Sequence, residues 1–179
     1  MAGELDVLRM VGERLDRAGI GYMLTGSFAM AYYATPRMTR DLDVVVALQE
    51  QDVAGVVSAF SSDFYVDDLA ARQAVRSAGL FNLMHLESGI KVDLIVRKPA
   101  EYRQVEFKRR TRVAFAGVET WIASREDLIL SKLVWARETD SELQRRDVRA
   151  LLDGPLDREY LEKWASLLDV STLLETIRK

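Results

Sequence analysis

The residues best suited to do chemistry together begin with Asp41 and Asp43, in the segment RDLDVVV. The apolar run predicts a strand over 41–47, and because side chains alternate along a strand, both carboxylates face the same side. Carboxylates held a few ångströms apart repel each other unless a cation or a proton lies between them. Hard divalent cations prefer such oxygen ligands, so the spacing predicts a site for Mg²⁺ or Mn²⁺.

Gly26 and Ser27 precede this pair, in the segment MLTGSFAM. A strand is predicted over 22–25 and a short buried helix over 28–34, so these two residues form the turn that opens the helix. Backbone N–H groups at a helix N-terminus lack partners within the helix and lie at the positive end of its dipole, where phosphate groups bind. An anion-binding turn is therefore predicted next to the metal-binding carboxylates.

Three further charged residues interrupt apolar patterns or border them. Asp93 lies inside the predicted strand KVDLIV, which is costly unless its carboxylate faces a metal ion, a base or a cleft, so it is a candidate third carboxylate. Lys132 interrupts the apolar helix LILSKLVWA, and Asp147 lies at the edge of the apolar face of the next predicted helix. These last two side chains either pair with each other or both face the site.

The elements that must position these residues follow from apolar periodicity and turn residues. The other predicted strands are 64–66, 81–86, 90–96, 110–115 and 118–122. The other predicted helices are 4–18, 51–60, 100–107, 125–138, 141–152, 158–168 and a last turn or two from 171, with 67–77 as a short helix or an ordered loop. This mixture predicts an α/β (α+β) fold. Because the chain becomes all helical at Ser124, we expect a core over 1–123 and a helical segment over 124–179 that packs on it.

The composition excludes several classes of protein. The 179 residues carry 25 basic and 28 acidic side chains, a net charge of −3, which argues against a general nucleic-acid coat protein. The lack of cysteine excludes disulfide frameworks and thiolate zinc sites. No apolar run approaches the roughly 20 residues that a membrane span needs, so we expect a soluble cytoplasmic protein without a membrane partner. Basic residues cluster over 108–112 and at Arg145, Arg146 and Arg149, where they are either solvated surface or contacts to nucleic acid.

Taken in order, the pattern of a Gly-Ser turn, an Asp-x-Asp strand and a later strand-borne Asp resembles the nucleotidyltransferase superfamily typified by DNA polymerase β. The motif Arg37-x-Thr39-x-Asp41-x-Asp43, with Lys132 and Arg146-Asp147 downstream, resembles sequences of the branch that holds the AbiEii-like toxins of type IV toxin–antitoxin systems. The resemblance implies a mixed β-sheet nucleotidyltransferase core flanked by helices, with a C-terminal helical segment.

The resemblance also implies an activity, the transfer of a nucleoside monophosphate from an NTP to an acceptor hydroxyl of tRNA, another RNA, a protein or a small molecule. Two Mg²⁺ or Mn²⁺ ions would take part. The catalytic and metal-binding residues would be Asp41, Asp43 and Asp93. The nucleotide-binding residues would be Gly26, Ser27, Arg37, Lys132 and Asp147. An antitoxin would be a further partner. The alternative is a catalytically idle protein of the same fold that binds a nucleotide or a protein partner.

Overall fold

A mixed β-sheet forms the centre of the protein in a computed structural model that describes residues 2–35 and 41–179. The seven strands of the described residues are β1 (Tyr22–Thr25), β2 (Asp41–Val46), β3 (Phe64–Val66), β4 (Leu80–His85), β5 (Lys91–Val96), β6 (Thr111–Phe115) and β7 (Val118–Ile122). Their order across the sheet is β3-β4-β5-β2-β1-β7-β6. The β2–β5 and β1–β7 pairs are parallel and the other neighbours are antiparallel. The α/β fold predicted from the sequence is confirmed.

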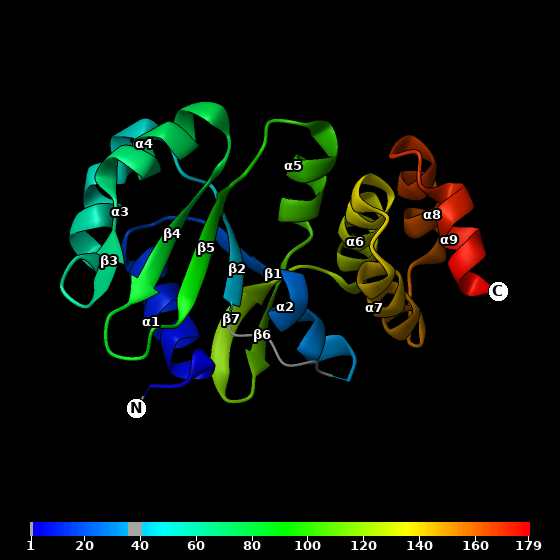
Figure 1. The fold of residues 1–179 in the computed structure, drawn as a ribbon, viewed down its shortest axis with the longest axis horizontal. Helices are drawn as coiled ribbons and strands as arrows, with labels where there is room; N and C mark the ends of the chain where they lie inside the picture. The colour runs from blue at the N-terminus through cyan, green and yellow to red at the C-terminus, as the bar shows by residue number, and fades with distance from the viewer. Residues whose placement is uncertain (1, 36–40) are drawn as a thin grey trace.

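Helices cover the sheet and extend beyond one end of it (Figure 1). They are α1 (Glu4–Arg17), α2 (Gly26–Tyr33), the 3-10 turn η1 (Glu50–Asp52), α3 (Val53–Phe60), α4 (Asp68–Ser77), α5 (Glu101–Lys108), α6 (Arg125–Thr139), α7 (Glu142–Leu152), α8 (Arg158–Leu167) and α9 (Ser171–Arg178). In Figure 1 the helices α3 and α4 lie at the β3 edge, whereas α6 to α9 gather at the opposite end. None of the helices in the described ranges is long and apolar enough to span a membrane.

The stretch 67–77, for which the sequence left helix and loop open, is the helix α4. Asp67 caps it, because its side chain accepts hydrogen bonds from the backbone N–H groups of Leu69 and Ala70. The helix buries only the small residues Ala71 and Ala74, which explains its weak apolar signal. Two other boundaries moved: the predicted helix over 51–60 begins with a 3-10 turn, and α2 begins two residues before the predicted start.

The two faces of the sheet differ where β2 and β5 run side by side. Leu42, Val44 and Val46 of β2 are buried on one face, as are the corresponding alternate residues of β5. The opposite face carries the intervening residues of both strands, among them Asp43 and Asp93, which are only half-buried. The period-two alternation thus separates an apolar core face from a face that presents charged groups.

Asp127, at the start of α6, links the helical half of the protein (α6 to α9) to the sheet half (β1 to β7 with α1 to α5). Its side chain is fully buried and accepts hydrogen bonds from the hydroxyl groups of Tyr160 at 2.6 Å and Tyr102 at 3.3 Å, which belong to α8 and α5. Ser124, the N-cap of α6, donates to the same carboxylate at 2.6 Å. Because a buried carboxylate without such donors would be costly, this network fixes α6 relative to α5 and α8.

Candidate functional site

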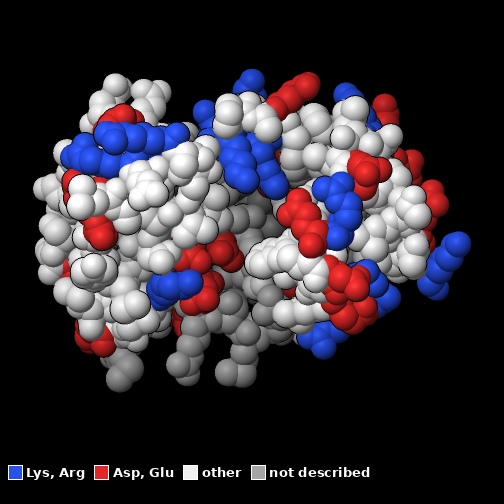
Figure 2. Space-filling model, turned by 45° about the horizontal axis from the view of Figure 1, so that its top comes forward, with Lys and Arg blue, Asp and Glu red and all other residues white. Residues whose placement is uncertain are grey.

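The register of two central parallel strands brings the sequence-predicted carboxylates together. Asp43 of β2 lies directly opposite Asp93 of β5, and Asp41 lies directly opposite Lys91. All four side chains point to the same face, because they are two residues apart on their strands. Figure 2 shows acidic side chains, with a basic one beside them, at the hollow between the two halves of the molecule. The sequence alone could not supply this register, since it depends on how distant segments pair.

Gly26 lies against the carboxylate of Asp43. Thr25, the last residue of β1, pairs with Asp43 in the sheet, so α2 begins beside that side chain. Gly26 has a φ of +67°, and a Cβ atom there would lie 2.9 Å from the Cβ of Asp43 and still closer to its carboxylate. Only glycine combines this left-handed conformation with so close an approach. The predicted anion-binding turn, Gly26-Ser27, is therefore adjacent to the predicted metal-binding strand.

The electrostatics of the site centre on Asp43. Burial raises the pKa of its carboxyl group from 3.8 to about 6, and the negative charges of Asp93 and Asp41 act in the same direction. The positive charges of Lys91 and Lys132 oppose this rise in the pKa. Like charges on adjacent strands thus cost free energy that a bound cation would recover.

The site has the chemistry, though not the ready-made geometry, of a divalent-cation site. Among the described residues no group of three or more His, Cys, Asp or Glu side chains is arranged so as to hold a metal ion as it stands. The Oδ1 atom of Asp93 is nevertheless buried and has no hydrogen-bond partner in the described part of the chain. An unpaired buried carboxylate oxygen next to Asp43 fits a hard cation or a proton donor that binds there.

Lys91 is the residue that sequence reasoning missed. Its Nζ atom lies 3.1 Å from Oδ2 of Asp93 and 3.7 Å from Oδ2 of Asp41. The hydrogen bond to Asp93 raises the pKa of the ammonium group, so Lys91 is charged at neutral pH. The signal was present in the sequence, because Lys91 precedes Asp93 by two residues and so had to share its face of the strand.

Lys132 and Asp147 form a buried ion pair between α6 and α7. Their side chains are 5% and 3% exposed, and Nζ of Lys132 lies 2.7 Å from Oδ2 of Asp147 and 3.1 Å from Oε1 of Gln144. Of the two arrangements that the sequence left open, the direct pair is the one observed. The positive charge of Lys132 also lowers the pKa of Asp43, so the pair lies within electrostatic reach of the carboxylate site.

Arg37, His85 and the two basic clusters complete the account of the notable charged and polar residues. Arg37 lies outside the described residues. His85 is 4% exposed, and its Nδ1 atom lies 2.8 Å from the hydroxyl of Ser88. Most arginines of the two basic clusters pair with carboxylates of their own chain: Arg109 with Glu126, Arg112 with Glu119, Arg145 with Asp140 and Arg149 with Glu142.

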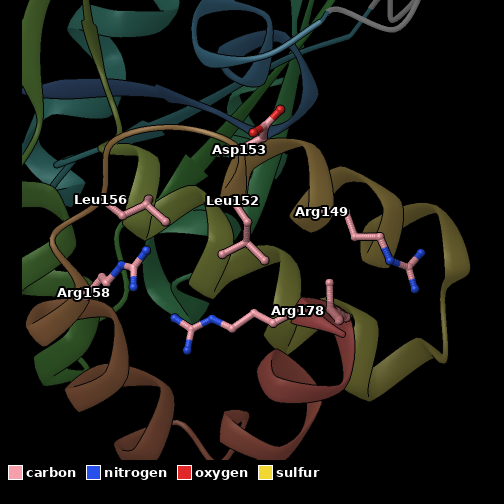
Figure 3. Close-up of a pocket in the computed structure, with 7 residues that line it drawn as sticks. Arg149, Leu152, Asp153, Leu156, Arg158 and Arg178 are labelled. Carbon is pink, nitrogen blue, oxygen red and sulfur yellow. The ribbon is translucent and has the colours of Figure 1, made fainter.

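A separate pocket of about 410 Å³ lies among α7, α8 and α9. Figure 3 shows Arg158 and Arg178 on one side of Leu152 and Arg149 on the other. None of the described residues that were predicted to hold the metal ion or the nucleotide lines it. The pocket is therefore distinct from the carboxylate site.

Comparison with known proteins places the fold. No family model matches the sequence, and no curated protein matches it. An antigenic nucleotidyltransferase-like protein from Paracoccidioides brasiliensis matches 97% of this chain and 91% of its own, with a TM-score of 0.61 at 18% identity. The antibiotic-resistance factor ANT(2'')-Ia matches 98% of this chain and 89% of its own, with a TM-score of 0.55 at 14% identity. The lincosamide antibiotic adenylyltransferase LnuA matches 80% and 92%, with a TM-score of 0.51 at 12% identity. The chain thus has a nucleotidyltransferase-like α/β fold.

We predict that Gly26→Ala destabilises the protein more than Gly19→Ala does. Both glycines have a positive φ, +67° and +68°, so both substitutions carry a similar backbone cost, but nothing lies within 4 Å of a Cβ atom at Gly19. The added clash with Asp43 should cost a further 1 kcal/mol or more, at about the size of an overpacking penalty. Urea denaturation of the two variants measures the difference, and equal losses would show that Asp43 moves aside freely.

We predict that Asp43→Asn stabilises the protein at neutral pH in the presence of EDTA. The pKa of Asp43 is higher in the folded state, about 6 against 3.8, so the folded state holds its proton over that interval and stability falls as the pH rises from about 4 to about 6. Asparagine removes this loss, by on the order of 2 kcal/mol at pH 7.5, and the gain should disappear near pH 4. Urea melts across this pH range test it, with the exposed Asp153→Asn as control; a gain that does not depend on pH would contradict it.

Proposed function

We propose that this protein transfers a nucleoside monophosphate from an NTP to an acceptor hydroxyl in a reaction that depends on Mg²⁺ or Mn²⁺. The observation that carries the proposal is the direct opposition of Asp43 and Asp93 on parallel strands, with the N-terminus of α2 packed against Asp43. A place for a cation and a place for phosphate groups therefore adjoin each other. The nucleotidyltransferase-like fold supports the same reaction class.

The residues have distinct roles in this proposal. Asp41 and Asp43 would hold the divalent cation, and Asp93 would accept the hydroxyl proton. Gly26 and Ser27 would receive the β- and γ-phosphates through backbone N–H groups at the start of α2. The cation, when bound, supplies positive charge to the triphosphate and favours loss of the hydroxyl proton.

The bonds of the reaction follow from these roles. The acceptor oxygen forms a bond to the α-phosphorus while the bond between the α-phosphorus and the bridging oxygen breaks, so that pyrophosphate leaves. The hydroxyl proton passes to the carboxylate of Asp93. The products are pyrophosphate and an acceptor that carries a nucleoside monophosphate.

The acceptor and the biological setting belong to the proposal as well. The acceptor hydroxyl belongs to tRNA, another RNA, a protein or a small molecule. The similarity of the sequence motifs to AbiEii-like toxins supports a toxin with an antitoxin partner. Two of the structural neighbours are described as an antibiotic-resistance factor and a lincosamide antibiotic adenylyltransferase, which supports a small-molecule acceptor.

We predict that the purified protein transfers label from α-³²P-labelled NTPs to a component of a cell extract in Mg²⁺ and not in EDTA. Asp43→Asn should abolish this transfer because it removes a ligand charge, while the protein stays folded by circular dichroism. Asp153→Asn, an exposed change elsewhere, should transfer at the wild-type rate. Isothermal titration with each NTP completes the test. Mg²⁺-dependent NTP binding without transfer by the wild type would favour the catalytically idle alternative.

We predict that Lys132 acts on bound NTP in addition to its pairing with Asp147. Lys132→Met alone should cost about 3–5 kcal/mol of stability, because it leaves the buried Asp147 carboxylate without its counter-charge. The double variant Lys132→Met/Asp147→Leu removes both charges and should recover most of this loss.

The double variant separates the two roles of Lys132. Its NTP affinity should be about tenfold weaker than that of the wild type if the positive charge helps to bind the triphosphate, a loss of about 1.4 kcal/mol. Isothermal titration measures this affinity, and urea denaturation confirms the fold. Unchanged affinity in a stable double variant would assign the ion pair to scaffolding alone.

A further inference from the structure

Lys91 bridges two of the three carboxylates of the proposed transfer site. Its Nζ atom lies within 3.1 Å of Asp93 and 3.7 Å of Asp41, and these two partners belong to different strands. The strand pairing dictates this arrangement, because Lys91 is directly opposite Asp41 and shares the face of Asp93. An ammonium group therefore lies on the same face, beside the three acidic side chains.

The contact with Lys91 distinguishes the two carboxylate oxygens of Asp93. Oδ2 accepts the hydrogen bond from Lys91, whereas Oδ1 is buried and has no partner among the described residues. A carboxylate tied through one oxygen has a fixed orientation, so the other oxygen is presented in one direction. Lys91 thus orients the carboxylate to which the proposed function assigns the hydroxyl proton.

The alternative interpretation is that Lys91 forms a partly exposed ion pair that only neutralises charge. The Lys91 side chain is 34% exposed and that of Asp41 is 55% exposed, and pairs of this kind contribute little to stability. The side chain of Asp93, however, is only 17% exposed, and the ammonium group contacts two carboxylates at once. Because the ion pairs of Lys91 contribute little to stability, a variant that lacks the Lys91 charge should still fold.

The charges of the protein's own side chains favour one divalent cation at this site. Asp41, Asp43 and Asp93 bring three negative charges, and Lys91 already offsets one of them. One divalent cation then balances the remaining two side-chain charges, whereas a second cation, even one that arrives with the triphosphate, would meet the ammonium group close to the same oxygens. A divalent cation and an ammonium group that contact the same carboxylate oxygens repel each other strongly in a partly buried site.

We propose that Lys91 is a positioning residue that substitutes for a second metal ion, so that this site binds one divalent cation through Asp41 and Asp43 while Lys91 holds Asp93. The proposal rests on the function proposed above. It replaces the two-ion site implied by the sequence resemblance with one ion and one ammonium group. It also gives Lys91, two residues before Asp93 on the same strand, a defined part in the reaction.

The test counts the Mn²⁺ ions bound per protein molecule. Free Mn²⁺ is measured by electron paramagnetic resonance during titration of the protein, alone and saturated with the α,β-methylene analogue of the NTP that binds most tightly. The ion carried by the analogue is included in the count. The wild type and Lys91→Arg should bind one ion in the ternary complex. Lys91→Met keeps the apolar stem and loses the charge, so it should bind two.

Lys98→Met is the matched control, because Lys98 is an exposed lysine that follows the same strand, and it should bind one ion as the wild type does. Lys91→Met should also lower kcat at least tenfold with little change in KM for the nucleotide, and Lys91→Arg should restore part of that loss. Two ions in the wild type, or one ion in Lys91→Met, would overturn the role of Lys91 and leave the proposed function intact. A wild type that binds no Mn²⁺ would instead overturn the proposed function.

Discussion

The repulsion between carboxylates on adjacent strands is the constraint around which this structure is arranged. In the middle of the sheet, parallel pairing of β2 and β5 places Asp43 opposite Asp93 and leaves neither strand free to shift. A shift of one residue would turn Leu42 and Val92, both fully buried, toward the charged face. The apolar core thus supplies the free energy that holds like charges together, and burial of the Asp43 carboxyl group, together with the charges of Asp93 and Asp41, raises its pKa.

The surroundings of the carboxylates divide into parts that confine them and parts that balance their charge. Gly26 brings the N-terminus of α2 against Asp43, and Lys91 bridges Asp41 and Asp93. Lys132 acts from the helical half, where its ion pair with Asp147 keeps it at a fixed place. That half is held in turn by the buried hydrogen bonds to Asp127. The electrostatic environment of one strand end therefore depends on packing far from it.

Much of the fold could be predicted because local patterns and tertiary packing agree. The antiparallel pairs β4–β5 and β6–β7, the strand that carries Asp41 and Asp43, and the helices α6 to α8 all lie close to their predicted bounds. The helix over 68–77 was uncertain because its buried face consists of alanines, which contribute little to an apolar periodicity. His85 is buried partly by the ring of Phe64, at 5.0 Å between centroids, which belongs to another strand. Local patterns report how a segment prefers to fold, but not what covers it.

The sequence by itself determined which residues could form a site: the spacing of Asp41 and Asp43, the acid within an apolar strand, and a glycine at the start of a helix. Each of these signals is local, since it depends on the two-residue period of a strand or on the free N–H groups of a helix end. Only the tertiary structure decided that Asp43 faces Asp93, that Lys91 faces Asp41, and that Lys132 pairs with Asp147. The reason is physical: strand register and helix packing are set by the burial of apolar surface between segments far apart in the chain, and the charged groups take the positions that this burial leaves to them.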